Sequence, residues 1–305
     1  MRANRVILSA IVASIIAVSQ GFAAPKPTSV QSKRPPVSTC LAIAENLDNS
    51  PLRQSVKYVN FERSAQFGPT FATLGSQIDT DPTRALTPFE VRIGFFDHST
   101  YIIESSAGIT AATDYFGFAQ YKSKGLIPNI VTMNKAHSTH FTLNPDARIE
   151  HVLPGWGAEA PAKHIIQVED MLVRNVTTDI VRGGFREADA NSIFIFEVAG
   201  LCIGHLGHLH HALTDTHYAN IGRLDVVMVP IDGAMTLSLI GMADIVKRMR
   251  ASVILPMHAR GFATPDTLIT MLGDGFDSLR LTGNSIILTI NSLPKRPTII
   301  VPSSL

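Results

Sequence analysis

The histidines of this chain are concentrated in one short segment. Four of the eleven, His205, His208, His210 and His211, fall within seven positions and closely follow the apolar run 192–198. Neutral imidazole is the protein side chain that most often binds transition metals. A strand that opens into a glycine-containing loop can bring several imidazoles to one point. The density of histidines therefore predicts a metal or catalytic site rather than core packing or ordinary surface.

Two further strand ends carry histidines. The β-like run 127–133 leads directly into the segment with His137 and His140, and the apolar run 252–257 ends at His258. In layered α/β folds, ligands gather at strand ends because loops converge there without breaking the hydrogen bonds of the sheet. We therefore expect these segments to meet at one site.

The elements that must position these residues are mostly short strands. Apolar runs separated by small or polar residues predict a meander from residue 91 onward. The expected strands are 91–96, 99–104, 108–114, 127–133, 149–153, 163–168, 171–176, 192–198, 225–230, 252–257 and a closing pair, 279–281 with 285–290. Helical spacing of apolar residues, with basic residues near the end, predicts a helix over 235–250. A short helix is expected over 265–272.

The first 23 residues have the features of a secretory signal peptide. Arg2 and Arg5 precede an apolar stretch, 6–18, and Gly21 and Ala23 are the small residues that a signal peptidase requires before cleavage. The stretch is shorter than the ~20 residues that a membrane-spanning helix needs, so an uncleaved anchor is the less favoured alternative. We expect a periplasmic or secreted protein without membrane contact after cleavage.

The rest of the chain is predicted to hold a Pro/Ser-rich extension, 24–50, and a single domain, 51–305. A hydrophobic fraction of 45% and a charged fraction of 17% are typical of a globular protein. Without the two arginines of the signal peptide, 24 basic residues face 25 acidic ones. This balance gives no support for nucleic-acid binding, so a small-molecule substrate is the expected partner.

The two cysteines, Cys40 and Cys202, are expected to be unpaired. They could form a disulfide in an oxidising compartment, but Cys40 lies in the predicted extension and Cys202 in a predicted core strand. Cys202 is expected to be a buried, inert thiol. A metal-ligand role, three positions before His205, is the alternative.

The order of these segments resembles the metallo-β-lactamase superfamily, and within it the lactonase-like hydrolases related to L-ascorbate 6-phosphate lactonase. The resemblance spans roughly residues 91–262. The motifs that carry it are Phe96-Asp97-His98-Ser99-Thr100, Thr113-Asp114-Tyr115, Asn134 to His140, His205 to His211, Asp225 to Pro230 and Ile254-Leu255-Pro256-Met257-His258. It implies an α/β fold, a four-layer αβ/βα sandwich with the metal site at one edge.

The first metal motif of the family, HxHxDH, aligns with residues 135–140. Its second and third histidines match His137 and His140, whereas Lys135 replaces the first histidine and Thr139 replaces the aspartate. A protonated lysine would repel a cation. Threonine cannot replace the missing carboxylate as a base.

The later HxGD-type motif is also altered. His205 matches its histidine, but His208 stands where the family has a carboxylate that bridges two metals, and His258 matches the last ligand. Neutral imidazole cannot bridge two cations as a carboxylate does, so we expect a single Zn²⁺-like ion with water in an open position. The ligands would be His140, His208 and His258, or alternatively His137, His205 and His208.

Other residues are expected to have supporting roles. His208 or His211 would carry the proton, and His210 would support a ligand, contact substrate or simply pack. His98 and Asp114 would orient ligands. Lys135 is either a surface lysine or a contact for an anionic substrate group. Trp156 is a possible pocket wall, although structural packing is favoured for a lone tryptophan.

The favoured function is an exported metal-dependent hydrolase that acts on a lactone, ester or phosphoester through metal-activated water. The alternative is a catalytically impaired family member that binds a metal or small ligand without turnover. The replacements at positions 135, 139 and 208 favour that alternative.

Overall fold

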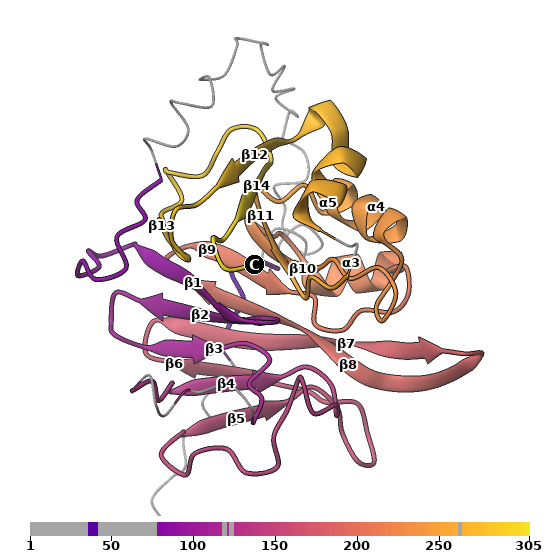
Figure 1. The fold of residues 1–305 in the computed structure, drawn as a ribbon. Coiled ribbons are helices and arrows are strands. Elements are labelled where there is room, and N and C mark those ends of the chain that lie inside the picture. The colour runs from indigo at the N-terminus through magenta and orange to yellow at the C-terminus, as the bar shows by residue number, and fades with distance from the viewer. Residues whose placement is uncertain (1–35, 42–77, 118–120, 122–124, 262–263) are drawn as a thin grey trace, which may run out of the picture. The chain divides into compact units, whose positions relative to one another are not determined.

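The computed structural model describes residues 36–41, 78–117, 121, 125–261 and 264–305. These residues belong to one compact unit, 35–305. The predicted signal peptide and most of the predicted extension lie outside the described residues. The described part of the chain is built on two β-sheets (Figure 1).

The first sheet has six strands and contains the predicted meander. Its strands, in spatial order, are β13 (Ser285–Leu288), β1 (Val91–Asp97), β2 (Thr100–Ser105), β3 (Thr110–Ala112), β4 (Ile130–Met133) and β5 (His151–Pro154). Strands β1, β2 and β3 pair antiparallel, whereas β3, β4 and β5 pair parallel. Alternate residues of β1 are buried, as expected for a strand with one face on a core.

The second sheet has eight strands and is parallel in one half. In spatial order they are β12 (Asp277–Arg280), β14 (Thr298–Val301), β11 (Val253–Met257), β10 (Val226–Pro230), β9 (Leu201–His205), β8 (Phe185–Val198), β7 (Met171–Arg182) and β6 (Ile165–Val168). The strands from β12 to β9 pair parallel, and those from β9 to β6 antiparallel. Every residue of β10 and β11 is buried, because elements cover both faces of this half.

The two sheets pack face to face, and helices cover the outer face of the eight-stranded sheet. The inner core joins Ile93 and Ile103 of the first sheet to Phe196 and Met228 of the second. The outer core packs the second sheet against helices α3 (Asp215–Ile221), α4 (Leu239–Met249) and α5 (Pro265–Leu272), which is followed by a short 3₁₀ turn, Gly273–Gly275 (Figure 1). The expected α/β sandwich is confirmed. In the described ranges, no helix covers the outer face of the six-stranded sheet, and none is long and apolar enough to cross a membrane.

Several predicted elements differ from the observed ones. Helix α4 begins at Leu239 rather than 235, because Asp232 binds the amides of residues 234–236 and Ser238 caps the helix. The predicted closing pair is wrong: β12 pairs with β14, and β13 pairs with β1 in the other sheet. Strand β14 and helix α3 were not predicted. Strands β7 and β8 are longer than predicted and form a hairpin that extends beyond the neighbouring strands (Figure 1).

The prediction of two unpaired thiols is wrong, because Cys40 and Cys202 form a disulfide with a Cα–Cα distance of 6.0 Å. The buried carboxylate of Glu197 on β8 holds the segment before Leu41. It accepts hydrogen bonds from Ser38 Oγ (2.5 Å) and the Thr39 amide (2.8 Å), and it pairs with Arg174 Nε at 2.8 Å. Burial would raise the pKa of Glu197, but the bonds from Ser38 and Arg174 hold it below its usual value. This part of the predicted extension therefore packs on the domain.

Candidate metal centre

The site forms where the carboxyl ends of parallel strands from both sheets meet. Strand β11 ends immediately before His258, and neighbouring β10 leads to Asp232. In the other sheet, β3 leads to Asp114 and β4 leads to the loop with His140. The turn between β1 and β2 contributes His98. The convergence predicted from the strand ends is therefore observed, although with a different set of histidines.

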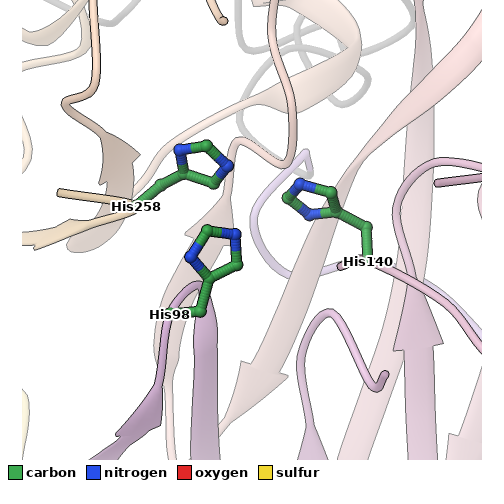
Figure 2. A group of neighbouring side chains, drawn as sticks. All are labelled: His98, His140 and His258. Carbon is green, nitrogen blue, oxygen red and sulfur yellow. The ribbon is translucent and has the colours of Figure 1, made fainter. Parts of the chain in front are cut away.

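Three imidazoles form the core of the site: His98, His140 and His258. One ring nitrogen from each lies within 4.8 Å of the other two, and the rings face a common space (Figure 2). Their centroids are 4.1 Å apart for His98 and His258, 5.2 Å for His140 and His258, and 5.5 Å for His98 and His140. Three imidazole nitrogens at such separations suit a Zn²⁺-like ion that keeps an open position.

The hydrogen bonding of these residues fits a metal. His98 Nε2, His140 Nε2 and His258 Nδ1 are buried and have no hydrogen-bond partner. A buried polar atom without a partner is costly, so each such atom requires an explanation. Burial, followed by the neighbouring imidazoles of His258 and His140, lowers the pKa of His98 to about 4. His98 is therefore neutral at pH 7, as a metal ligand must be.

Two buried aspartates support the histidines. Asp114 Oδ2 lies 2.6 Å from His140 Nδ1, which leaves His140 Nε2 for a metal. Asp232 Oδ1 lies 3.3 Å from His258 Nδ1, without making a hydrogen bond to it. Burial would raise the pKa of Asp114, but His140 holds it well below its usual value. A carboxylate behind an imidazole fixes the ring and increases its basicity.

The backbone of the site is unusual. His98, Asp114 and His258 have φ angles of 50°, 45° and 57°, in the left-handed region. They are three of the eight non-glycine residues with positive φ in the described ranges. Such conformations cost energy and concentrate where the surrounding structure has a functional reason to impose them.

His205, which was expected among the ligands, lies outside this group. Its Nε2 donates to the Ser99 carbonyl at 2.8 Å, so its Nδ1 is the acceptor, at 3.0 Å from Asn134 Nδ2 and 3.1 Å from the Gly207 amide. Both ring nitrogens thus have protein partners. His205 connects the two sheets beneath the site.

His208 lies beside the group of three, with its ring centroid 4.7 Å from that of His140 and 5.3 Å from that of His258. Its protonation follows from its neighbours. The Val181 carbonyl can only accept, so His210 Nδ1 donates to it (2.8 Å) and His210 Nε2 accepts from His208 Nδ1 (2.7 Å). His208 Nε2 then keeps its lone pair. Burial, followed by the neighbouring imidazole of His140, lowers the pKa of His208 to about 2.

The remaining predicted residues are more peripheral. His211 bonds through Nδ1 to the Ala212 carbonyl and through Nε2 to the Asp179 amide, so both of its nitrogens have protein partners. His137 is exposed and bonds to Thr139 at 2.9 Å, with its ring centroid 6.1 Å from that of His140. Trp156 packs edge-on against Phe141. Lys135 is half-buried at the end of β4.

Sequence reasoning gave His98 an orienting role, whereas the structure places it in the central group. The signal was present, because His98 follows a predicted strand directly, as His258 does. The rule that ligands gather at strand ends applies to it equally.

The chain is similar to several solved structures. A protein from Thermotoga maritima described as a member of the metallo-β-lactamase superfamily is 24% identical, with a TM-score of 0.48, and the match covers 69% of this chain and 97% of that chain. The metallo-β-lactamase fold protein YhfI from Bacillus subtilis is 11% identical, with a TM-score of 0.47, and the match covers 70% of this chain and 97% of that chain.

No functionally curated protein matches the chain. The family model described as "Beta-lactamase superfamily domain" matches residues 92–258, more than half of the 305 residues. These residues run from β1 to His258 and so include all three central histidines. The chain belongs to the metallo-β-lactamase superfamily.

Proposed function

We propose that the protein is an exported metal-dependent hydrolase that uses one divalent metal ion, preferably Zn²⁺, held by His98, His140 and His258. Its substrate class is an ester, lactone or phosphoester. The observation that carries the proposal is the set of three imidazoles that each offer one nitrogen within 4.8 Å of the other two, with His98 Nε2 and His140 Nε2 buried and without a hydrogen-bond partner. A bound zinc ion supplies Lewis acidity and lowers the pKa of a coordinated water toward neutrality.

His208 is the residue of this chain best placed to accept a proton. The bond from His208 Nδ1 to His210, and from His210 to the Val181 carbonyl, leaves Nε2 of His208 as an acceptor beside the central group. Since burial disfavours its charged form, His208 would bind a proton only transiently and pass it on. His210 fixes the tautomer and so has a positioning role.

Export is supported by the disulfide between Cys40 and Cys202. Disulfides persist in oxidising compartments such as the bacterial periplasm and are rare in reducing ones. Together with the signal-like sequence of the first 23 residues, this favours a periplasmic or secreted location.

Zinc binding by the full chain tests the proposed centre directly. Metal analysis after dialysis against zinc should give one equivalent for the wild type and a large loss for His98→Ala, His140→Ala or His258→Ala. The matched control is His151→Ala, at the start of β5, which should keep the full equivalent. Wild-type protein that binds no zinc under these conditions would refute the proposed centre.

Hydrolysis is tested separately with a panel of generic esters, lactones and phosphodiesters. Chelator-sensitive turnover that His208→Ala lowers, while zinc stoichiometry stays at one, supports the enzyme and the role of His208. One firmly bound zinc ion with no turnover across the panel favours a family member that binds without catalysis.

A further inference from the structure

At one end of the sandwich, both sheets finish in an edge strand. Strand β5 is the last strand of the six-stranded sheet and β6 is the last of the eight-stranded sheet, and within the part of the chain that the structure describes neither has a second neighbour (Figure 1). The two strands lie across the core from each other, since His164, just before β6, bonds through Nε2 to the Pro154 carbonyl of β5 at 2.7 Å. The unpaired backbone groups of an edge strand are a template for pairing with another strand.

The backbone groups of Ile165 and Gln167 point away from the sheet. The His164 amide donates to Asn175 Oδ1 on β7 at 2.7 Å, so this amide faces β7. Successive residues of a strand direct their backbone groups to opposite edges, so those of Ile166 also face β7. The N–H and C=O groups of Ile165 and Gln167 are therefore on the open edge. Both residues are exposed.

The side chains of β6 alternate between the core and the solvent. Ile166 is partly buried and packs against the inner core, whereas Ile165 and Gln167 lie on the exposed face. Exposed residues of opposite charge flank the strand, with Lys163 before it and Glu169 after it. Neither side chain forms an ion pair with another described residue. Both charges are therefore available to a partner at this edge.

Strand β6 is complementary to a second copy of itself in antiparallel pairing. With Ile166 opposite Ile166 of the second copy, Ile165 lies opposite Gln167, and each such pair can exchange both of its N–H···O bonds. The same register sets Lys163 opposite Glu169 of the second copy, and symmetry repeats this pair of opposite charges. A register two residues away would lose both charge pairs, so the charges specify this register.

We propose that two copies of this chain associate through β6, as a symmetric dimer in which the eight-stranded sheets join edge to edge. A twofold axis through Ile166 relates the copies, so each surface is its own partner. The same axis brings the two β5 edges alongside each other and adds Val152, which is 37% exposed, to the contact. A strand of four residues supplies only a small contact area, so the dimer should form reversibly and depend on protein concentration.

Sedimentation velocity of the full-length protein at about 1–100 µM tests the proposal. The wild type should shift from monomer toward dimer across this range. Ile165→Pro should remain monomeric, because proline removes a donor from the open edge and obstructs the second strand while the bonds from β6 to β7 remain. Its thermal unfolding should stay cooperative, which shows that the monomer is folded.

Charge reversal gives a second test that does not depend on the proline variant. Lys163→Glu and Glu169→Lys should each weaken dimerisation by about tenfold or more, because each sets like charges opposite one another twice. The double variant Lys163→Glu/Glu169→Lys should regain the wild-type affinity, and an equimolar mixture of the two single variants should form the mixed dimer. Lys247→Glu, on α4, is the matched control, because it makes the same change of net charge and should leave dimerisation unchanged.

Three results would count against the proposal. A wild type that is monomeric over the whole range would overturn the second copy as the occupant of this edge. A dimer that tolerates Ile165→Pro and both charge reversals would place the interface on another surface. A dimer that Ile165→Pro abolishes but that neither charge reversal weakens would refute the register centred on Ile166.

Discussion

Removal of the Cys40–Cys202 disulfide is expected to destabilise the domain substantially. Cys40→Ala is the cleanest change, because Cys40 lies in the segment before the sheets whereas Cys202 is fully buried in β9. The substitution leaves the core side of the bond in place. It should not disturb the candidate metal centre, whose residues come from other segments.

The magnitude follows from the length of chain that the bond closes, which is 162 residues. The loop-entropy relation gives about 5 kcal/mol for such a loop, and observed losses are typically about 2–5 kcal/mol. In a domain of this size, 1 kcal/mol changes Tm by roughly 2–4 °C. We expect Tm to fall by roughly 6–16 °C, for a loss of about 3–4 kcal/mol.

Thermal unfolding with and without dithiothreitol provides the measurement. Wild-type protein under reducing conditions should unfold near the Tm of Cys40→Ala, and the variant should not respond to the reductant. Zinc stoichiometry, measured on both, should be equal. A wild-type Tm that is insensitive to reductant and equal to that of the variant would show that the two cysteines are not bonded in solution.

Four further substitutions test other features of the structure. His98→Ala should abolish zinc binding. His205→Ala should retain zinc but destabilise the fold by about 2–3 kcal/mol, because it leaves the buried partners of His205 without a hydrogen bond. Loss of zinc in His205→Ala with intact stability would contradict this assignment. Gly207→Ala should cost more than about 2 kcal/mol in urea unfolding, since its φ is 61° and a Cβ would meet Asn191 Oδ1 at 2.6 Å. Glu197→Gln should lower stability at pH 7 by about 2–4 kcal/mol. The folded-state pKa of Glu197 is depressed, so its contribution is present above the unfolded-state pKa of about 4.3 and is lost as pH falls through the folded-state value. The difference between wild type and Glu197→Gln should therefore shrink below about pH 4, and a difference independent of pH would refute this reading.

Much of the fold could be predicted because its strands are marked by local patterns. The runs that became β10 and β11 are nearly continuous and apolar, as strands buried on both faces must be. Their parallel pairing brings their carboxyl ends together. The sequence alone suggested this convergence, because the apolar run 252–257 ends at a histidine, His258. The partner of β12 could not be read in this way, because pairing across a sheet depends on contacts distant in sequence.

The location of the site was predicted better than the set of residues that form it. Histidine at a strand end is a local signal, but which of its nitrogens remains free is decided by distant partners. His205 shows this, since Ser99 and Asn134 engage its ring from other segments. The disulfide was missed for the same reason, because nothing in the sequence around Cys40 indicates that Glu197 holds that segment against β8.

The left-handed backbone at His98, Asp114 and His258 also restricts how the site can evolve. Apart from glycine, the residues that adopt this conformation readily are asparagine, aspartate and histidine. Two of these, aspartate and histidine, are metal ligands or partners of metal ligands. The backbone therefore limits the atoms that could bind a metal at these three positions to nitrogen and oxygen. Branched side chains are disfavoured there by local sterics alone. A library randomised at the three positions and selected only for folding should therefore return mainly glycine, asparagine, aspartate and histidine, even without selection for metal binding.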